Sequence, residues 1–157
     1  MADFVYNRAL GRVAELANRV NADDPANSVF LVLALGSAAA DATLKDLDDI
    51  AAIEANGSTA EATNSGYSRK SLNQAAGITV TIDDTNDRTD VDIPDQTWTA
   101  VATSPGAWTD LVTAYDSDTT GGTDANIIPM TQHDFAVTPD GSDITAQIAA
   151  AGFFRAA

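Results

Sequence analysis

Apolar residues recur at intervals of three and four near the start of the chain, while most of the charged residues between them fall elsewhere on a helical projection. The apolar stripe consists of Tyr6, Leu10, Val13, Ala17 and Val20. This spacing predicts a mainly helical segment over residues 3–21. A polar, proline-containing turn follows, and residues 29–35 are a continuous apolar run that is typical of a strand covered on both faces.

A second helical pattern follows this strand. Asp41 is suited to cap a helix, and Asn56-Gly57 supplies its end. The apolar side of this predicted helix consists of Leu44, Leu47, Ile50 and Ile53. Residues 56–66 contain almost no apolar side chain, so we expect an exposed loop there.

The pattern changes to alternation after residue 76. Residues 78–82 and 91–93 alternate on either side of the polar segment 83–88, which predicts a hairpin. Further strands are predicted at residues 97–101, 108–115, 134–138 and 144–148. The last two flank Pro139-Asp140-Gly141-Ser142, which predicts a second hairpin with its turn at Gly141.

Helices before residue 56 and strands after residue 76 favour an α+β fold. We expect an antiparallel β-sheet or sandwich, mainly in residues 76–150, with two helices in the N-terminal part. A chain of 157 residues is the size of a single domain. In this interpretation residues 1–27 form an N-terminal helix, or docking arm, and a turn, and residues 28–157 form the α+β body.

Composition limits the chemistry of the chain. It has 20 Asp and 3 Glu against 2 Lys and 6 Arg, for a net charge of −15, and this charge opposes binding to nucleic acid or to an anionic membrane. It has no Cys and one His, so it is poor in nucleophiles, proton shuttles and soft metal ligands. The composition therefore predicts a protein that is not an enzyme and that uses no cofactor.

One segment matches the first half of a calcium-binding loop, with oxygen ligands at alternate positions followed by a Gly. The candidate ligands are Asp116, Asp118, Thr120 and Asp124. Ile127 stands where such a loop has its bidentate Glu, so the site is short of charge. An ordinary surface turn is the competing interpretation, because Asp, Thr and Gly are common turn residues.

A catalytic triad around His133 has little support in the sequence. Asp134 follows it directly, and neighbours in a strand face opposite ways. The chain also has no Gly-x-Ser-x-Gly segment to present a nucleophilic serine. A hydrogen-bonded structural histidine is therefore the favoured interpretation.

Positive charge gathers at two places, although the rest of the chain is strongly acidic. The N-terminal group is either a solvated helix face or a docking surface for an acidic partner. The two terminal aromatic residues either fill the chain's own core or reach into another subunit. The candidate partner-binding residues are Arg8, Arg12, Arg19, Tyr67, Arg69, Lys70, Phe153 and Phe154.

Several segments together resemble small virion structural proteins of tailed bacteriophages. The resemblance lies in residues 63–70 (TNSGYSRK), 115–118 (YDSD), 124–129 (DANIIP), 133–142 (HDFAVTPDGS) and 152–154 (GFF). It extends from the first predicted helix to the last residue. It implies a component of a phage particle rather than any catalytic activity.

Within that class, the charge favours a decoration or cement protein on the outer surface of the head, assembled in the host cytoplasm. Many copies, each near −15, would be repelled by packaged DNA inside the shell. The expected partners are the major capsid protein and further copies of this chain, with a trimer as the expected oligomer. The alternatives are a neck or tail component present in few copies, or a calcium-binding adhesion module.

Overall fold

A strand that is buried on both faces organises the molecule. The computed structural model describes residues 3–156, and in it the apolar run forms β2 (Val29–Ser37), as predicted. This strand lies inside a six-stranded antiparallel sheet. The order of the sheet is β1 (Phe4–Val5), β9 (Ile128–Val137), β8 (Trp108–Asp116), β2 and β3 (Ala60–Glu61), and β4 (Lys70–Leu72) also pairs with β2.

Alternate side chains of β2 enter two different hydrophobic cores, because successive residues of a strand point to opposite faces. Phe30, Val32 and Ala34 belong to the larger core. Leu31, Leu33 and Leu35 belong to the smaller one. Both faces of the sheet must therefore be covered by other elements.

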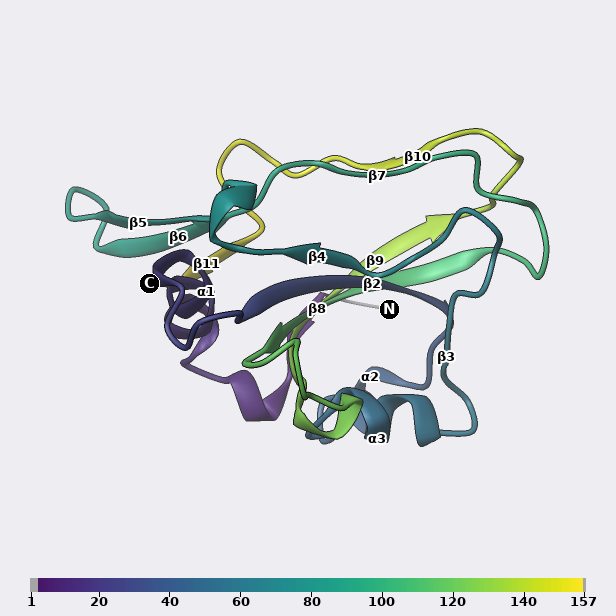
Figure 1. The fold of residues 1–157 in the computed structure, drawn as a ribbon, viewed down its shortest axis with the longest axis horizontal. Helices are drawn as coiled ribbons and strands as arrows, with labels where there is room; N and C mark the ends of the chain where they lie inside the picture. The colour runs from purple at the N-terminus through teal and green to yellow at the C-terminus, as the bar shows by residue number, and fades with distance from the viewer. Residues whose placement is uncertain (1–2, 157) are drawn as a thin grey trace.

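The two faces are covered differently (Figure 1). The helices α2 (Asp41–Leu44) and α3 (Ile50–Ala55) lie below the sheet and close the smaller core. A two-stranded sheet of β7 (Gln96–Trp98) and β10 (Ile144–Ala146) lies above it. The larger core also takes side chains from a three-stranded sheet of β5 (Thr79–Asp83), β6 (Arg88–Asp92) and β11 (Phe154–Ala156), and from α1 (Val13–Ala22).

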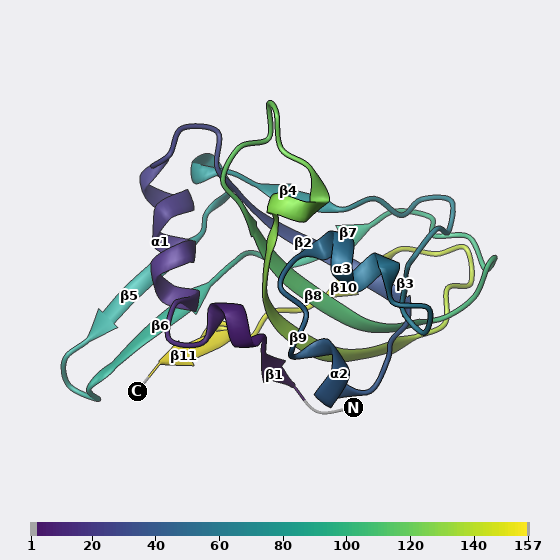
Figure 2. The same cartoon turned by 90° about the horizontal axis from the view of Figure 1, so that it is seen from below.

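This arrangement confirms the predicted α+β class, with antiparallel sheets and with the α-helices before residue 56. The hairpin of β5 and β6 is also confirmed, with Thr79 opposite Asp92 and Asp83 opposite Arg88. Seen from below, this hairpin projects past α1 from the rest of the body (Figure 2). Among residues 3–156, no helix has the length and hydropathy needed to cross a bilayer.

The N-terminal segment differs from the predicted single helix over residues 3–21. It forms β1, then a 3₁₀ turn at Asn7–Ala9, and only then α1. The outer edge of β9 takes residues 4 and 5 as a pairing strand, and the Tyr6 N–H donates to the Met130 carbonyl. Four residues of α1 then enter the larger core, so the segment is part of the body rather than a separate arm.

The second predicted helix is broken in two. Asp41 lies in the first turn of α2 rather than capping it, and Asp49 caps α3 by accepting a hydrogen bond from the Ala52 N–H. This cap starts a new helix, and both pieces still bury the predicted side, with Leu44, Ile50 and Ile53 inside and Leu47 partly covered. The expected loop over residues 56–66 contains the short strand β3.

The second predicted hairpin is wrong. β9 and β10 do not pair with each other: β9 lies in the central sheet and β10 pairs with β7. The turn after Pro139 is held by residues of another segment, since Val101 exchanges backbone hydrogen bonds with Gly141 and Ser142. The sheet also draws on residues before 76, because β1 to β4 belong to it. The remaining short elements are 3₁₀ turns at Gln74–Ala76 and Asp124–Asn126.

The loop before β4 is fixed against the loop after β7 by Gly66. A Cβ atom on Gly66 would lie 2.7 Å from the Thr99 carbonyl oxygen and 2.8 Å from that of Ala100, and its φ is +89°. Gly77 has nearly the same φ, +87°, but open space around it. A comparison of Ala substitutions at these two positions therefore separates the cost of backbone strain from the cost of steric overlap.

We expect Gly77→Ala to lower the free energy of unfolding by about 1 kcal/mol, the cost of a left-handed residue with a side chain. Gly66→Ala should cost at least about 2 kcal/mol, since overlap with two carbonyl oxygens adds to the same strain. Urea denaturation of both variants measures the difference. Equal losses at the two positions would contradict a close contact at Gly66.

Candidate docking surface

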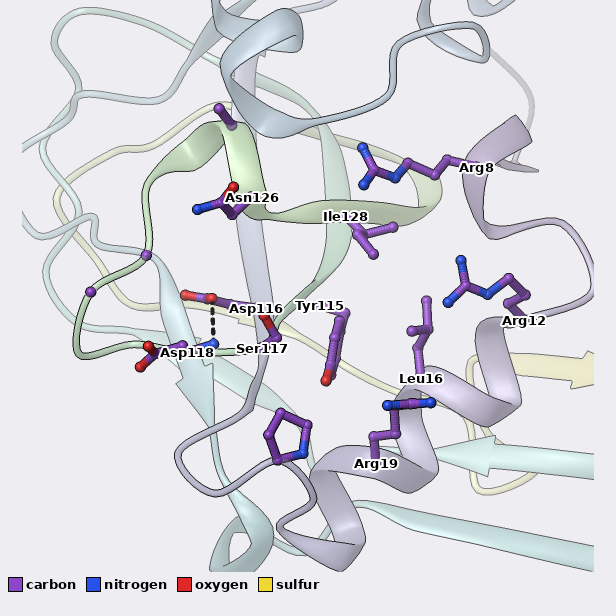
Figure 3. Close-up of a pocket in the computed structure, with 14 residues that line it drawn as sticks. Arg8, Arg12, Leu16, Arg19, Tyr115, Asp116, Ser117, Asp118, Asn126 and Ile128 are labelled. Carbon is purple, nitrogen blue, oxygen red and sulfur yellow. Dashed lines mark hydrogen bonds between the residues drawn. The ribbon is translucent and has the colours of Figure 1, made fainter.

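A cleft beside α1 brings together the three arginines of the N-terminal segment. Arg8 comes from the 3₁₀ turn, Arg12 from the residue before α1 and Arg19 from the last turn of α1. The cleft has a volume of about 560 Å³. The three guanidinium groups lie along one side of it, and Asp116 and Asp118 lie on the other (Figure 3).

Helical spacing places these groups together. Arg12, Glu15 and Arg19 follow one another at intervals of three and four, which puts them on one face of the helix. The opposite face of α1 is apolar and buried, and it fixes the orientation of the helix on the body. The charged face is therefore held toward solvent and toward the cleft.

One carboxylate serves two of the arginines. Glu15 accepts from Arg19 Nε at 2.6 Å and from Arg12 Nε at 3.3 Å, and all three side chains are nearly half exposed. The hydrogen bond from Arg19, together with that from Arg12, holds the pKa of Glu15 below its ordinary value. Arg8 donates to the backbone carbonyl of Asp48 at 2.9 Å. Two of the three guanidinium groups on the basic side of the cleft thus share one carboxylate, and the third is held by a backbone carbonyl.

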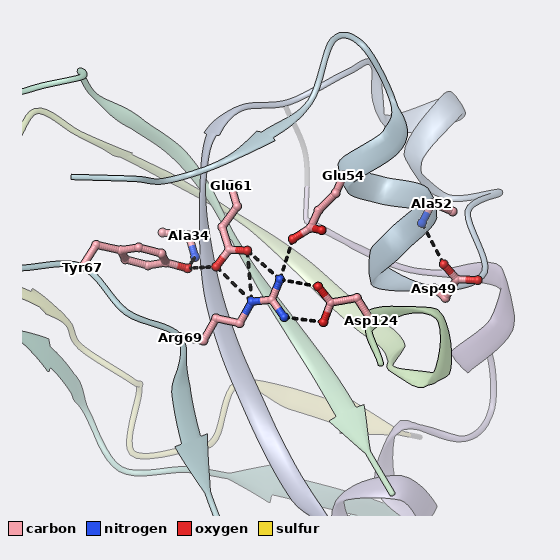
Figure 4. Close-up of polar contacts among 8 residues, drawn as sticks. All are labelled: Ala34, Asp49, Ala52, Glu54, Glu61, Tyr67, Arg69 and Asp124. Atoms are coloured by element: carbon pink, nitrogen blue, oxygen red, sulfur yellow. Dashed lines mark hydrogen bonds and ion pairs between the residues drawn. The ribbon is translucent and has the colours of Figure 1, made fainter. Parts of the chain in front are cut away.

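The second basic group in the sequence has a different environment. Arg69 lies among three carboxylates, those of Glu54, Glu61 and Asp124 (Figure 4). Its Nη2 lies 2.7 Å from Glu61 Oε2, and its Nη1 lies 2.7 Å from Asp124 Oδ1. We refer to these four residues as the Arg69 cluster; it ties β3, α3 and the 3₁₀ turn before β9 to the start of β4.

The charges of the Arg69 cluster shift one another's pKa. Burial alone would lower the pKa of Arg69, but its hydrogen bonds to Asp124 and Glu61 outweigh burial and raise it. The hydrogen bonds from Arg69 lower the pKa of Asp124. Burial and the neighbouring carboxylate of Glu61 raise the pKa of Glu54. One cation therefore holds three acids together.

Tyr67 and Lys70 also have partners inside the chain. The Tyr67 hydroxyl donates to Glu61 at 2.6 Å and accepts from the Ala34 N–H at 3.0 Å. The Tyr67 ring contacts the rings of Trp98 and Trp108, and the Lys70 ammonium lies 5.3 Å from the centre of the Trp98 ring. These contacts give Tyr67, Arg69 and Lys70 a role in holding the fold, which the sequence did not indicate. Their binding to a partner stays a prediction.

The terminal aromatic residues pack against the chain itself. Phe153 contacts Phe30 edge to face at a centroid distance of 5.4 Å. Phe154 begins β11 and lies opposite Val91 of β6. Both are partly buried against the larger core, which agrees with the first of the two interpretations of this pair. Contact with another subunit stays a prediction.

The candidate calcium loop is stabilised by turn hydrogen bonds. Asp116 Oδ1 accepts from the Asp118 N–H at 3.0 Å, and Asp118 Oδ1 accepts from both the N–H and the hydroxyl of Thr120. The fourth candidate ligand, Asp124, turns both carboxylate oxygens toward Arg69. Across residues 3–156, no three His, Cys, Asp or Glu side chains form a metal-binding group. Calcium binding by this loop stays a prediction.

His133 has a carboxylate partner that lies far away in the sequence. Its Nδ1 lies 3.2 Å from Asp3 Oδ2, and its Nε2 lies 2.8 Å from the hydroxyl of Thr131. Thr131 in turn shares a hydrogen bond with Thr113 at 2.6 Å. A cavity of about 310 Å³ lies beside this chain of hydrogen bonds. The Thr131 hydroxyl, which is the nearest hydroxyl to His133, is covered, since Thr131 is only 2% exposed. The contacts of Asp3 with His133 and Asp134 attach the start of β1 to β9.

Comparisons of the chain with protein-family models, with curated proteins and with solved structures find no match. The functional assignment therefore depends on the residues and on the geometry described above.

We expect Arg69→Gln to lower the free energy of unfolding at pH 7 by about 2 to 3 kcal/mol. The loss is smaller than for a fully buried pair because the Arg69 side chain is 25% exposed. Without the cation the three acids repel one another, so the folded-state pKa values of Glu54 and Asp124 rise and protonation restores stability. The deficit should therefore shrink as the pH falls from 7 toward about 4.

Chemical denaturation at several pH values measures this effect. Arg155→Gln is the control, because Arg155 pairs with Asp90 at the surface with 43% of its side chain exposed. It should cost less than about 1 kcal/mol. A deficit in Arg69→Gln that stays constant with pH would contradict mutual repulsion of the acids.

Asp3→Asn tests the attachment of the N-terminal strand. Burial raises the pKa of Asp3, but hydrogen bonds from the Asp134 N–H and from His133 lower it by more. A lowered carboxyl pKa contributes stability above the unfolded-state value and loses it as the pH falls through the folded-state value. The variant should thus be less stable than the parent at pH 7, by under about 1 kcal/mol, and equally stable near pH 2. Urea melts at both pH values measure the difference, and an equal loss at both would contradict it.

Proposed function

We propose that this chain is a structural protein of a tailed-phage particle, and that it is a decoration protein that binds the outer surface of the head and stabilises the shell. The observation that carries this proposal is the distribution of its few cations. Three of the eight lie on one cleft, in a molecule whose net charge is −15. Such a molecule has one side on which an acidic partner can dock.

The other cations are occupied within the fold. Arg69 serves three carboxylates, Arg88 lies within 3.2 Å of Asp83 and Asp90, and Arg155 pairs with Asp90. The two lysines lie over the rings of Phe4 and Trp98. Docking through charge is therefore best supported at Arg8, Arg12 and Arg19.

The excess of Asp supports a position outside the shell. Packaged DNA and a molecule of charge −15 repel each other, so a many-copy protein of this kind is disfavoured on the inner wall. On the outside the same charge keeps particles apart in solution. The proposed partners are the major capsid protein and further copies of this chain, arranged as a trimer at threefold positions of the lattice.

Mechanically, the proposed role is to bridge neighbouring capsid subunits rather than to carry out a reaction. The two cores and the Arg69 cluster join the elements of the chain into one body. A protein that binds across the boundary between two capsid subunits stabilises the shell. It binds only the assembled state, so its binding shifts the equilibrium toward assembly.

The test is binding of the purified chain to preformed heads that lack it, followed by co-sedimentation and by heating of the particles. We expect saturable binding and a higher disruption temperature of the heads. The variant Arg8→Gln/Arg12→Gln/Arg19→Gln should bind at least about tenfold more weakly, since each charge-assisted contact contributes about 1 kcal/mol or more.

The matched control changes the net charge by the same amount at exposed positions elsewhere, with Gln74→Glu, Thr85→Glu and Gln147→Glu. It should keep most of the binding. Equal loss in both variants would show that net charge, not the cleft, governs docking. Absence of any binding by the parent chain to heads would overturn the proposal, and a few copies per particle on a virion gel would assign the chain to the neck or tail instead.

A further inference from the structure

We infer that the cleft beside α1 binds an extended acidic peptide segment of the partner, and that a partner carboxylate replaces Glu15 between Arg12 and Arg19. That the partner is a protein of the phage head rests on the proposed function. The chemistry of the site rests on the cleft alone.

The spacing of the arginines fits an extended chain. The guanidinium groups of Arg12 and Arg19 lie closer together than their seven-residue separation suggests, because both Nε atoms contact the same Glu15 carboxylate, at 3.3 and 2.6 Å. An extended peptide rises about 3.3 Å per residue and points alternate side chains to the same side, so neighbours on one side are separated by about 7 Å. Acidic residues at every second position therefore place their carboxylates on one side of the peptide, toward the two guanidinium groups.

In the free chain Glu15 lies between Arg12 and Arg19, but it does not use all of their N–H donors. It takes one hydrogen bond from each arginine, and both come from Nε. A guanidinium group has five N–H donors, so the Nη groups of Arg12 and Arg19 have capacity for further carboxylates. Figure 3 shows both side chains directed along the same side of the cleft. Glu15 thus keeps the arginines in place and competes with an incoming acid.

Apolar side chains lie beneath the charges, where Leu16 is 1% and Tyr115 4% exposed and Ile128 is partly exposed. Leu16 and Ile128 line the cleft between the arginines, and the Tyr115 ring lies across it (Figure 3). A peptide with small or apolar residues between its acids can therefore contact this surface.

The opposite side of the cleft selects against other anions. Asp118 is exposed there, and Asp116 lies beside it. A nucleic-acid strand carries a charge on every nucleotide and would place some of these charges against the two carboxylates. A peptide can present acids to the arginines and neutral groups to the aspartates. The cleft therefore favours a peptide with acids on one side only.

The experiment uses the full chain and a fluorescent peptide, Thr-Glu-Val-Glu-Thr-Glu-Val, with fluorescence anisotropy as the measurement at low and at physiological salt. The comparison peptide has Gln in place of each Glu. We expect saturable binding of the acidic peptide only, weakened by salt. Arg12→Gln/Arg19→Gln should weaken binding at least about tenfold.

The distinguishing variant is Glu15→Gln, which removes the internal competitor. We expect it to bind the acidic peptide at least about threefold more tightly than the parent. Its control is Asp87→Asn, which changes the net charge equally at an exposed residue whose positive φ suits Asn. Weaker or unchanged binding by Glu15→Gln, with an unchanged circular dichroism spectrum, would overturn the exchange of carboxylates.

Two further outcomes would contradict the inference and leave the proposed function unaffected. If the chain binds phage heads but not the peptide, the cleft is not a peptide site, and docking occurs by other means. If a single-stranded oligonucleotide of equal charge binds as tightly as the peptide, the selection by Asp116 and Asp118 is wrong. Conversely, peptide binding without binding to heads would support the cleft and overturn the head-decoration role.

Discussion

Burial of β2 on both faces is the constraint on which the rest of the structure depends. Because alternate side chains of the strand enter different cores, each face of the central sheet needs its own cover. The small helices α2 and α3 cover one face. The other is covered by α1 and by strands drawn from the second half of the chain, including the C-terminal β11. The fold therefore closes only when both ends of the chain have joined the body.

Scarcity of positive charge is the second constraint. With 8 cations against 23 acids, each Arg or Lys occupies a position where it satisfies carboxylates, covers an aromatic ring or faces the cleft. Arg69 is the extreme case, because it joins acids from three separate elements. Once the structure has used the other cations in this way, the group beside α1 is the best-supported place for an acidic partner. This allocation supports the proposed docking surface.

The candidate site was predictable only in part. The N-terminal arginines were identified as a group because they lie close together in sequence, and they do share one cleft. The group at Tyr67 to Lys70 looked the same in sequence, yet its partners are Ala34, Glu61, Trp98 and Asp124, which lie up to 55 residues away. The partner of His133 is Asp3, 130 residues away, rather than the adjacent Asp134. Pairings at such separations leave no local pattern in a single sequence.

Local chemistry by itself determined the apolar strand at residues 29–35, the hairpin of β5 and β6, the α+β class and the excess of negative charge, since each depends on neighbouring residues or on composition. Tertiary structure alone decided the division of the N-terminal segment between β1 and α1, because an unpaired edge of β9 competes with helix formation there. It also decided that β10 pairs with β7, since the choice of strands that cover a sheet face depends on the packing of the whole chain. Arg69 followed the same rule, because its partly buried position depends on Asp124, a carboxylate 55 residues away that the fold brings beside it.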